Sequence, residues 1–294
     1  MGLSFCGILQ PTMNTQASIN ASLKLTQSHY ENFPVASFLL PKKLREPIAL
    51  IYAFARQADD FADEGDLLPE DRLALIQGFE KELDLIRQNA KPDTDLFIAL
   101  QETINKHQLP IQAFYDLLDA FSQDITKTRY QDFGEVMNYC RRSANPIGRL
   151  MLRLYKADTP QNIGMADAIC SALQIINFLQ DIAIDIQKNR IYLPQDEMQK
   201  YKITEAQIIS GNTSGTWSIF MEFEINRARK LLQSGAPLGL ALPGRIGLEM
   251  RMIIAGGERI LKKLHQCHGN VFEFRPKLQM KDWAYIAYRA LSKK

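Results

Sequence analysis

Apolar residues recur along almost the whole chain with the three- and four-residue spacing of amphipathic helices, whereas alternating β-branched runs bounded by turn signals are rare. The pattern predicts an all-α fold. Prolines mark several expected helix starts, because proline is favoured in the first helical turn; they are Pro41, Pro69, Pro110 and Pro160. The expected helices cover residues 41–64, 69–88, 93–107, 110–123, 131–156 and 160–187, followed after shorter helices by 216–234, 241–266 and 279–292.

The 294 residues contain no Gly/Ser-rich linker, charge block or internal repeat that would divide the chain. We expect residues 1–20 to form a loose tail and residues 21–294 a single helical domain. No stretch of about 18 residues is uninterruptedly apolar, and the start lacks the basic and apolar regions of a signal peptide. These features favour a soluble cytoplasmic protein, with peripheral membrane contact as the other possibility.

The charge balance gives no reason to expect a nucleic-acid partner, because 35 basic residues face 33 acidic ones. The glycine patterns of P-loops and dinucleotide-binding folds are absent, which argues against a nucleotide cofactor. The four cysteines are scattered without CxxC spacing, as expected for reduced thiols in the cytoplasm.

One predicted helix carries an acidic stripe. Tyr52, Arg56, Asp59 and Asp63 follow one another at steps of four, three and four residues, so they share one helical face. Carboxylates one turn apart repel unless a cation lies between them. The stripe is therefore either a solvated helix end before a Gly65 cap or one half of a cation-binding site.

A second predicted helix carries Asn177, Asp181 and Asp185 at four-residue steps, which places them within an arc of about 80°. Apolar residues cover nearly all of the remaining circumference, so this helix should be buried on most sides. Buried carboxylates need a counter-charge. They face either an arginine of a neighbouring helix or an internal cavity that holds cations.

Two such stripes can face each other across a helical bundle and bind divalent cations. An all-oxygen set of Asp and Asn suits Mg2+, which commonly completes its coordination with phosphate oxygens. Basic residues near the stripes would supply the rest of a diphosphate site; they are Arg56, Arg141, Arg142, Lys188 and Arg190. A zinc site at His265 and His268 lacks two further ligands.

These residues resemble the squalene/phytoene synthase family, and the resemblance extends from about His29 to the last predicted helix. It is carried by Phe33, Leu39–Pro41, Ile51–Asp63, Asn177–Asp185 and Arg190–Pro194. The resemblance implies an isoprenoid-synthase helical bundle around a deep apolar cavity. It also implies an enzyme that processes prenyl diphosphates with Mg2+.

Residue by residue, the resemblance implies that Asp59, Asp63, Asn177, Asp181 and Asp185 hold Mg2+ against the diphosphate. The catalytic positions would be the four aspartates and Tyr52. The substrate-binding positions would be His29, Tyr30, Glu31, Asn32, Phe33, Arg56, Asn145, Gln174, Arg190 and Tyr192.

Within the family, three stretches look most like the hydroxysqualene synthase branch of bacterial hopanoid biosynthesis: His29–Pro34, Asp63–Asp66 and Cys140–Gly148. That branch converts presqualene diphosphate and water to hydroxysqualene and diphosphate. Gln180 stands where condensing members usually carry an arginine, so we expect one phosphate-binding charge to be missing.

Two other functions remain open from the sequence. One is a condensing squalene, dehydrosqualene or phytoene synthase, and the other is a non-catalytic assembly protein of the same fold. Neighbouring pathway enzymes are possible partners. Phe33, Phe54 and Phe178 are candidates for cation–π stabilisation of a carbocation. Asn145, Tyr52 and Tyr139 are candidates for positioning the water that captures it.

Overall fold

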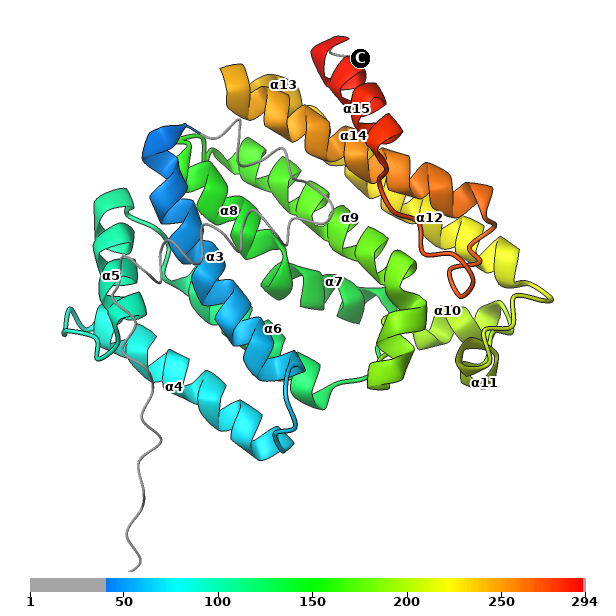
Figure 1. Ribbon diagram of the computed structural model, residues 1–294, viewed down its shortest axis with the longest axis horizontal. Coiled ribbons are helices and arrows are strands. Elements are labelled where there is room, and N and C mark those ends of the chain that lie inside the picture. The colour runs from blue at the N-terminus through cyan, green and yellow to red at the C-terminus, as the bar shows by residue number, and fades with distance from the viewer. Residues whose placement is uncertain (1–40, 293–294) are drawn as a thin grey trace, which may run out of the picture.

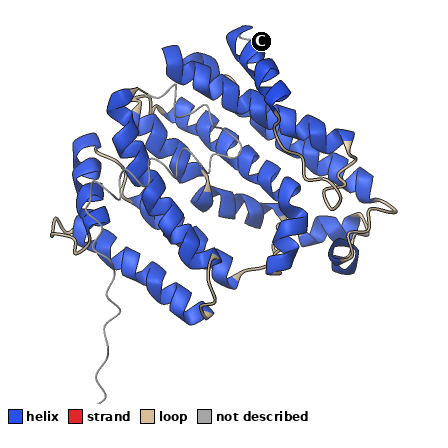
Figure 2. Ribbon diagram, viewed as in Figure 1, coloured by secondary structure: helices blue, strands red, loops and turns tan. Residues whose placement is uncertain are grey.

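The computed structural model describes residues 41–292, and over this span the all-α prediction is confirmed. Figure 2 shows helices joined by loops, with no strand among the described residues. The expected tail at 1–20 and the substrate-site candidates His29, Tyr30, Glu31, Asn32 and Phe33 lie outside this span, so they stay predictions.

The helices follow the predicted order closely. In chain order they are α3 (Lys42–Asp63), α4 (Pro69–Arg87), α5 (Asp95–His107), α6 (Gln112–Thr126), α7 (Phe133–Ser143), α8 (Asn145–Leu154), α9 (Pro160–Asp185), the 3-10 turn η1 (Ile186–Lys188), α10 (Gln195–Lys200), α11 (Glu205–Ile209), α12 (Trp217–Gly235), α13 (Leu238–Ala241), α14 (Gly244–Gln266) and α15 (Met280–Ser292).

The single helix predicted over 131–156 is wrong, because the chain breaks at Ala144 into α7 and α8. Pro146 explains the break. It has no N–H to donate, and its ring would clash with the carbonyl four residues earlier in a continuous helix. The break lets α7 and α8 pack against α9 as separate helices.

The helices divide into two groups with separate hydrophobic clusters (Figure 1). One cluster joins α3 to α4, α5, α6 and α8, with Phe54 and Phe114 fully buried in it. The other joins α9 to α7, α12 and α14, with Trp217 and Phe220 at its centre. Helices α3 and α9, which carry the acidic stripes, therefore belong to different clusters.

The segment Pro160–Lys188 is long and apolar enough to cross a membrane by length and composition, with a mean hydropathy of 1.4 in its most apolar window. Half of that window is buried, and α9 packs against α8 and α12 in the middle of the bundle (Figure 1). The core helix of a folded domain meets the same criteria.

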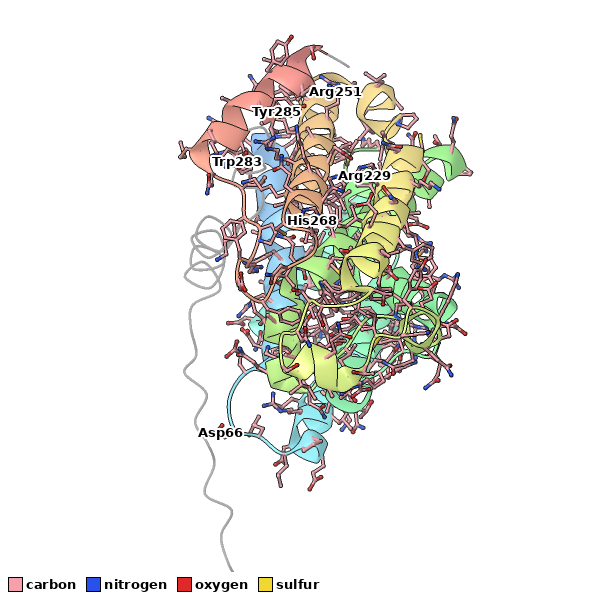
Figure 3. All side chains as sticks on the ribbon, turned by 90° about the vertical axis from the view of Figure 1, so that its right-hand side faces the viewer. Asp66, Arg229, Arg251, His268, Trp283 and Tyr285 are labelled. Carbon is pink, nitrogen blue, oxygen red and sulfur yellow. The ribbon has the colours of Figure 1, made fainter. Side chains whose placement is uncertain are left out.

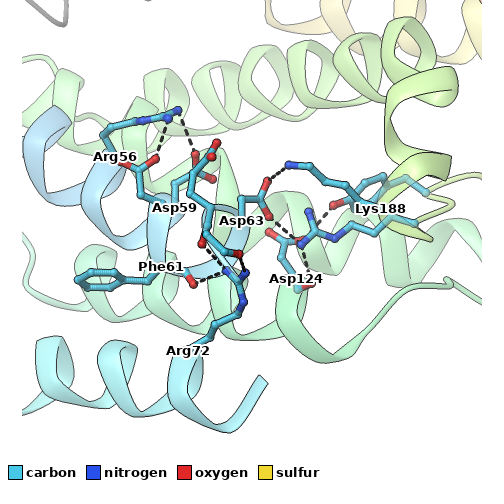
Figure 4. A network of polar contacts seen from close by, with 12 residues as sticks. Arg56, Asp59, Phe61, Asp63, Arg72, Asp124 and Lys188 are labelled. Atoms are coloured by element: carbon cyan, nitrogen blue, oxygen red, sulfur yellow. Dashed lines mark hydrogen bonds and ion pairs between the residues drawn. The ribbon is translucent and has the colours of Figure 1, made fainter. Parts of the chain in front are cut away.

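The C-terminal end of α3, which carries Asp63, is held by an arginine from the next helix. The Arg72 guanidinium donates to the carbonyls of Phe61 at 2.9 Å, Glu64 at 3.0 Å and Gly65 at 2.6 Å (Figure 4). Carbonyls at a helix end have no partner within the helix. Arg72 therefore fixes the turn in which the acidic stripe ends.

Arg72→Ala should lower the free energy of unfolding by about 1–3 kcal/mol, because it removes three hydrogen bonds from the α3 terminus and leaves the part-buried carbonyl of Phe61 without this donor. Chemical denaturation measures this loss. The matched change Arg87→Ala removes an exposed ion pair to Asp84 on the same helix and should cost under about 0.5 kcal/mol. Equal losses in both variants would contradict the capping role of Arg72.

Candidate functional site

The end of α3 and the chain that follows α9 meet at Asp63 (Figure 4). Lys188, in the turn that ends α9, lies 2.7 Å from Asp63 Oδ2, and Arg190 lies 2.7 Å from Asp63 Oδ1. Although burial works in the opposite direction, hydrogen bonds from Arg190 and Lys188 hold the pKa of Asp63 below its usual range. The two helix groups are thus joined here by a three-residue ion network.

On the α3 side, Arg56 pairs with two carboxylates, 2.6 Å from Asp60 and 3.5 Å from Asp59. Burial, reinforced by the charge of Asp63, raises the pKa of Asp59 to about 6. Tyr52 lies half-buried one turn before Arg56. Tyr52, Arg56, Asp59 and Asp63 are all half-buried, and Asp60 joins them as a member that the sequence pattern did not indicate.

On the α9 side, Asn177 donates to Asp181 Oδ2 at 2.8 Å, and burial together with Asp181 raises the pKa of Asp185 to about 7. Gln174 is half-buried one turn earlier, as are Asn177, Asp181 and Asp185. The flanking apolar residues are largely buried, as predicted; they include Ile175, Ile176, Phe178, Leu179 and Ile182.

The loop after α9 is shaped so that Arg190 turns back toward the stripes. Asn189 adopts a left-handed conformation at φ 57°, which ends the helical turn. The N–H of Ile191 then donates to the carbonyl of Thr128 at 3.0 Å. Arg129 holds the same loop through hydrogen bonds to Asn189 and a two-pronged pair with Glu205 at 2.8 Å.

A hydrogen-bond network around the buried Asp124 holds Arg190 in place. Asp124 accepts hydrogen bonds from the hydroxyls of Tyr139 at 2.6 Å and Tyr192 at 2.9 Å, and its backbone carbonyl accepts one from Arg190 at 2.8 Å. The ring of Tyr192 stacks on Phe178 with centroids 3.8 Å apart. Burial raises the pKa of Asp124 to about 6. Sequence periodicity gave no signal for Asp124.

The ion network around Asp63 does not include the basic pair that the sequence indicated at the end of α7. Arg142 pairs with Asp119 at 2.5 Å and Arg141 is exposed, so this pair does not join the ion network around Asp63. Gln180, where the sequence predicts a missing phosphate-binding charge, is almost fully buried and donates to the carbonyl of Pro276 at 2.7 Å. An arginine at position 180 would meet that loop first.

A guanidinium group reaches Asp181 from a distant part of the chain. Arg275, in the loop that Gln180 anchors, forms a two-pronged ion pair with Asp181 in which Nη2 lies 3.0 Å from Oδ2. The two residues are separated by 94 positions. Only the path of the loop between α14 and α15 brings them together.

Two further residues that the sequence indicated as candidates for the site lie in the packed interior. Phe54 is fully buried among Phe79, Phe97 and Phe114, so it is a core residue and does not line a site. Asn145 is buried between α8 and α9, where its Oδ1 accepts a hydrogen bond from Ser171 at 2.9 Å. His265, where the sequence offered too few ligands for zinc, has its Nδ1 2.6 Å from Glu222 Oε2.

The donor chemistry of the two stripes suits a divalent cation. Within residues 41–292 no three His, Cys, Asp or Glu side chains converge as they would around a bound metal. Fixed cations engage Asp63 and Asp181, whereas Asp59 and Asp185 keep raised pKa values and would gain most from added positive charge. Oxygen ligands of this kind fit Mg2+.

The described fold and site define a class: a helical enzyme that brings carboxylates and guanidinium groups together to process prenyl diphosphates. The chain belongs to the squalene/phytoene synthase family, which matches residues 26–282. Members of this family use prenyl diphosphate substrates with a divalent metal.

Three relatives are close enough to compare along most of the chain. Hydroxysqualene synthase of Zymomonas mobilis is 34% identical over 87% of this chain and 85% of its own. Hydroxysqualene synthase of Rhodopseudomonas palustris is 36% identical over 80% of this chain and 79% of its own. The crystal structure of squalene synthase HpnC from Alicyclobacillus acidocaldarius is 32% identical, covers 86% of this chain and 95% of its own, and superposes with a TM-score of 0.79.

Asp124→Leu should lower the free energy of unfolding by about 2–4 kcal/mol, because it leaves the buried hydroxyl of Tyr139 and the part-buried hydroxyl of Tyr192 without an acceptor. Asp124→Asn retains one acceptor oxygen and should cost distinctly less. Denaturant titration of both variants measures the difference. If Asn and Leu destabilise the protein equally, the hydroxyl network is not what holds this part of the site.

Proposed function

We propose that this chain is a hydroxysqualene synthase, which converts presqualene diphosphate and water to hydroxysqualene and diphosphate. The observation that supports it most directly is that Lys188 and Arg190 pair with Asp63 of α3 and also act electrostatically on Asp185 of α9. Two relatives with this name at 34% and 36% identity support the same reaction.

In this proposal the first step is ionisation of the carbon–oxygen bond, in which the diphosphate leaves with the bonding electrons. Arg190, Lys188 and Arg56 would stabilise the charge that develops on the departing oxygens. Tyr52 and Gln174 would line the same site. Mg2+, held by Asp59, Asp63, Asn177, Asp181 and Asp185, would supply Lewis-acid stabilisation of the leaving diphosphate.

The second step is capture of the carbocation by water, which forms a new carbon–oxygen bond and releases a proton. The stacked rings of Phe178 and Tyr192 lie beside Arg190, where their π faces could stabilise the cation. Asp124 fixes Tyr192 through its hydroxyl. We propose that the substrate cavity is apolar around these rings, so that bulk water is excluded.

Residues 21–294 would act as one domain in the cytoplasm, with neighbouring pathway enzymes as potential partners. The main rival function is condensation of two prenyl diphosphates, as in phytoene synthases of the same family. Gln180 bears on this choice, because it faces Pro276 and supplies no second phosphate-binding charge. A non-catalytic assembly protein would have no use for half-buried carboxylates bridged by cations.

Asp59→Asn, Asp63→Asn, Asp181→Asn and Asp185→Asn should each reduce turnover of presqualene diphosphate by roughly 100-fold or more, because each removes negative charge from the cation site. Circular dichroism should show an unchanged helical content. Asp119→Asn, which alters an exposed carboxylate paired with Arg142, should keep wild-type turnover. Wild-type rates in any two of the four variants would overturn the metal assignment.

With purified protein and Mg2+, presqualene diphosphate in 18O-labelled water should give hydroxysqualene labelled in its hydroxyl group. The label is expected because the chain shows no dinucleotide fingerprint that would indicate a hydride donor. Farnesyl diphosphate alone should give little product. Efficient condensation of farnesyl diphosphate, or an unlabelled hydrocarbon from presqualene diphosphate, would move the protein to the condensing branch.

A further inference from the structure

Helix α15 presents an apolar and aromatic face to solvent. Tyr288 is 66% exposed, Leu291 68% and Met280 85%, and Tyr285 follows at 44%. At 100° per residue these four side chains share one side of the helix with Lys281 and Arg289, which are also exposed. Four large exposed hydrophobic residues within 12 positions form a continuous patch and not scattered surface residues.

The opposite face of α15 is held firmly against α14. Asp282 is fully buried, 2.7 Å from Arg259 Nε and 2.5 Å from Lys263 Nζ. Ile286 and Ala290 are buried on the same side, and Arg251 donates to the carbonyl of Ala290 at 2.7 Å. The helix therefore cannot roll its exposed aromatic residues into the core without breaking buried ion pairs.

The charges around the exposed face are positive. Lys281 and Arg289 lie on it, Lys277 is exposed just before it, and the single acidic residue of α15, Asp282, is buried and neutralised. Tyrosine beside leucine, with lysine and arginine at the edge, is the composition of helices that lie in the interface of an anionic membrane.

A groove of about 690 Å3 runs beside this helix, between α12, α13, α14 and α15. Its floor is apolar, with Leu232, Ala236 and Ile254 among the lining residues. Basic side chains also line it, namely Arg251, Arg259, Lys262 and Arg289, and its one carboxylate, Glu258, is paired with Arg229. An apolar floor with basic walls suits an acyl chain that ends in an anionic headgroup.

A second exposed apolar patch has acidic neighbours, whereas the neighbours of the α15 patch are basic. Leu67 and Leu68, after the end of α3, are 45% and 60% exposed. Their neighbours in sequence are acidic and exposed; they are Glu64, Asp66, Glu70 and Asp71. An anionic surface would repel this patch, so charge distinguishes the two apolar surfaces.

We propose that the exposed face of α15, together with the groove beside it, docks the protein on an anionic phospholipid bilayer. Tyr285, Tyr288 and Leu291 enter the headgroup region, and Lys281 and Arg289 contact the phosphates. Figure 3 shows Trp283 and Tyr285 of α15 near the top of the view and Asp66 near the bottom, so the acid-flanked patch lies away from the docked face.

The test measures binding of the full chain to vesicles without substrate, so its result is independent of turnover. Vesicles of pure phosphatidylcholine are compared with vesicles containing about one-third phosphatidylglycerol. The wild-type protein should cosediment with the anionic vesicles, and added salt should weaken binding. Lys281→Glu/Arg289→Glu should lower the partition coefficient by about 25-fold or more, since each basic residue near the surface contributes about fivefold.

Tyr288→Ser/Leu291→Ser should lower binding by roughly tenfold or more through lost apolar burial. The matched controls are Leu67→Ser/Leu68→Ser, which removes the acid-flanked patch, and Lys81→Glu/Lys106→Glu, which reverses exposed charges on α4 and α5. Both controls should bind anionic vesicles within about twofold of wild type. All variants should turn over detergent-solubilised substrate at the wild-type rate, because none lies in the proposed site.

Three results would overturn the proposal. The first is that wild-type protein does not bind anionic vesicles, and the second is that the α15 variants bind as well as their controls. The third is a dimer of the wild-type protein, by light scattering, that Tyr288→Ser/Leu291→Ser converts to a monomer, since α15 would then be a subunit interface.

Discussion

Repulsion among half-buried carboxylates is the constraint on which the rest of this structure depends. Two helices from different hydrophobic clusters carry these carboxylates, and the charge of Asp63 on α3 acts on Asp185 of α9. Carboxylates removed from bulk water need counter-charge nearby, because their desolvation is costly. Basic side chains on several loops supply that positive charge.

Each loop that delivers a cation is itself fixed by specific contacts. Arg190 reaches Asp63 because the chain turns at Asn189 and pairs with the segment around Thr128. Arg275 reaches Asp181 because Gln180 anchors the neighbouring carbonyl of Pro276. Charges held in this way are preorganised, so little reorganisation is required when a ligand's charge develops beside them.

The outer layer of the bundle shows the same dependence on buried charge. Asp282 joins α15 to α14 through Arg259 and Lys263, and hydrogen bonds from these side chains outweigh burial and lower the pKa of Asp282 to about 2. The pair fixes which side of α15 faces outward. Ion pairs at Asp63 thus position residues of the acidic site, and separate buried ion pairs at Asp282 fix the apolar surface of α15 on the exterior.

The sequence by itself determined the all-α fold, nearly all helix ranges and the two acidic stripes, because these depend on local periodicity and on where prolines can begin a helix. It predicted the faces of Asp59, Asp63, Asp181 and Asp185 for the same reason. Only the tertiary structure decided the partners of these residues. Arg72, Asp124 and Arg275 reach the site from other helices and loops, and their roles depend on chain paths that helical spacing does not encode.

The partners of other residues that the sequence singled out have the same origin. Arg141 and Arg142 lie at the end of α7, and the break between α7 and α8 at Ala144 leaves Arg142 beside Asp119. Gln180 is adjacent to Asp181, but neighbouring helical residues point about 100° apart, and this difference is enough to turn its amide to Pro276. The direction in which a side chain points across the bundle depends on how the helices pack, so proximity in sequence could not predict it.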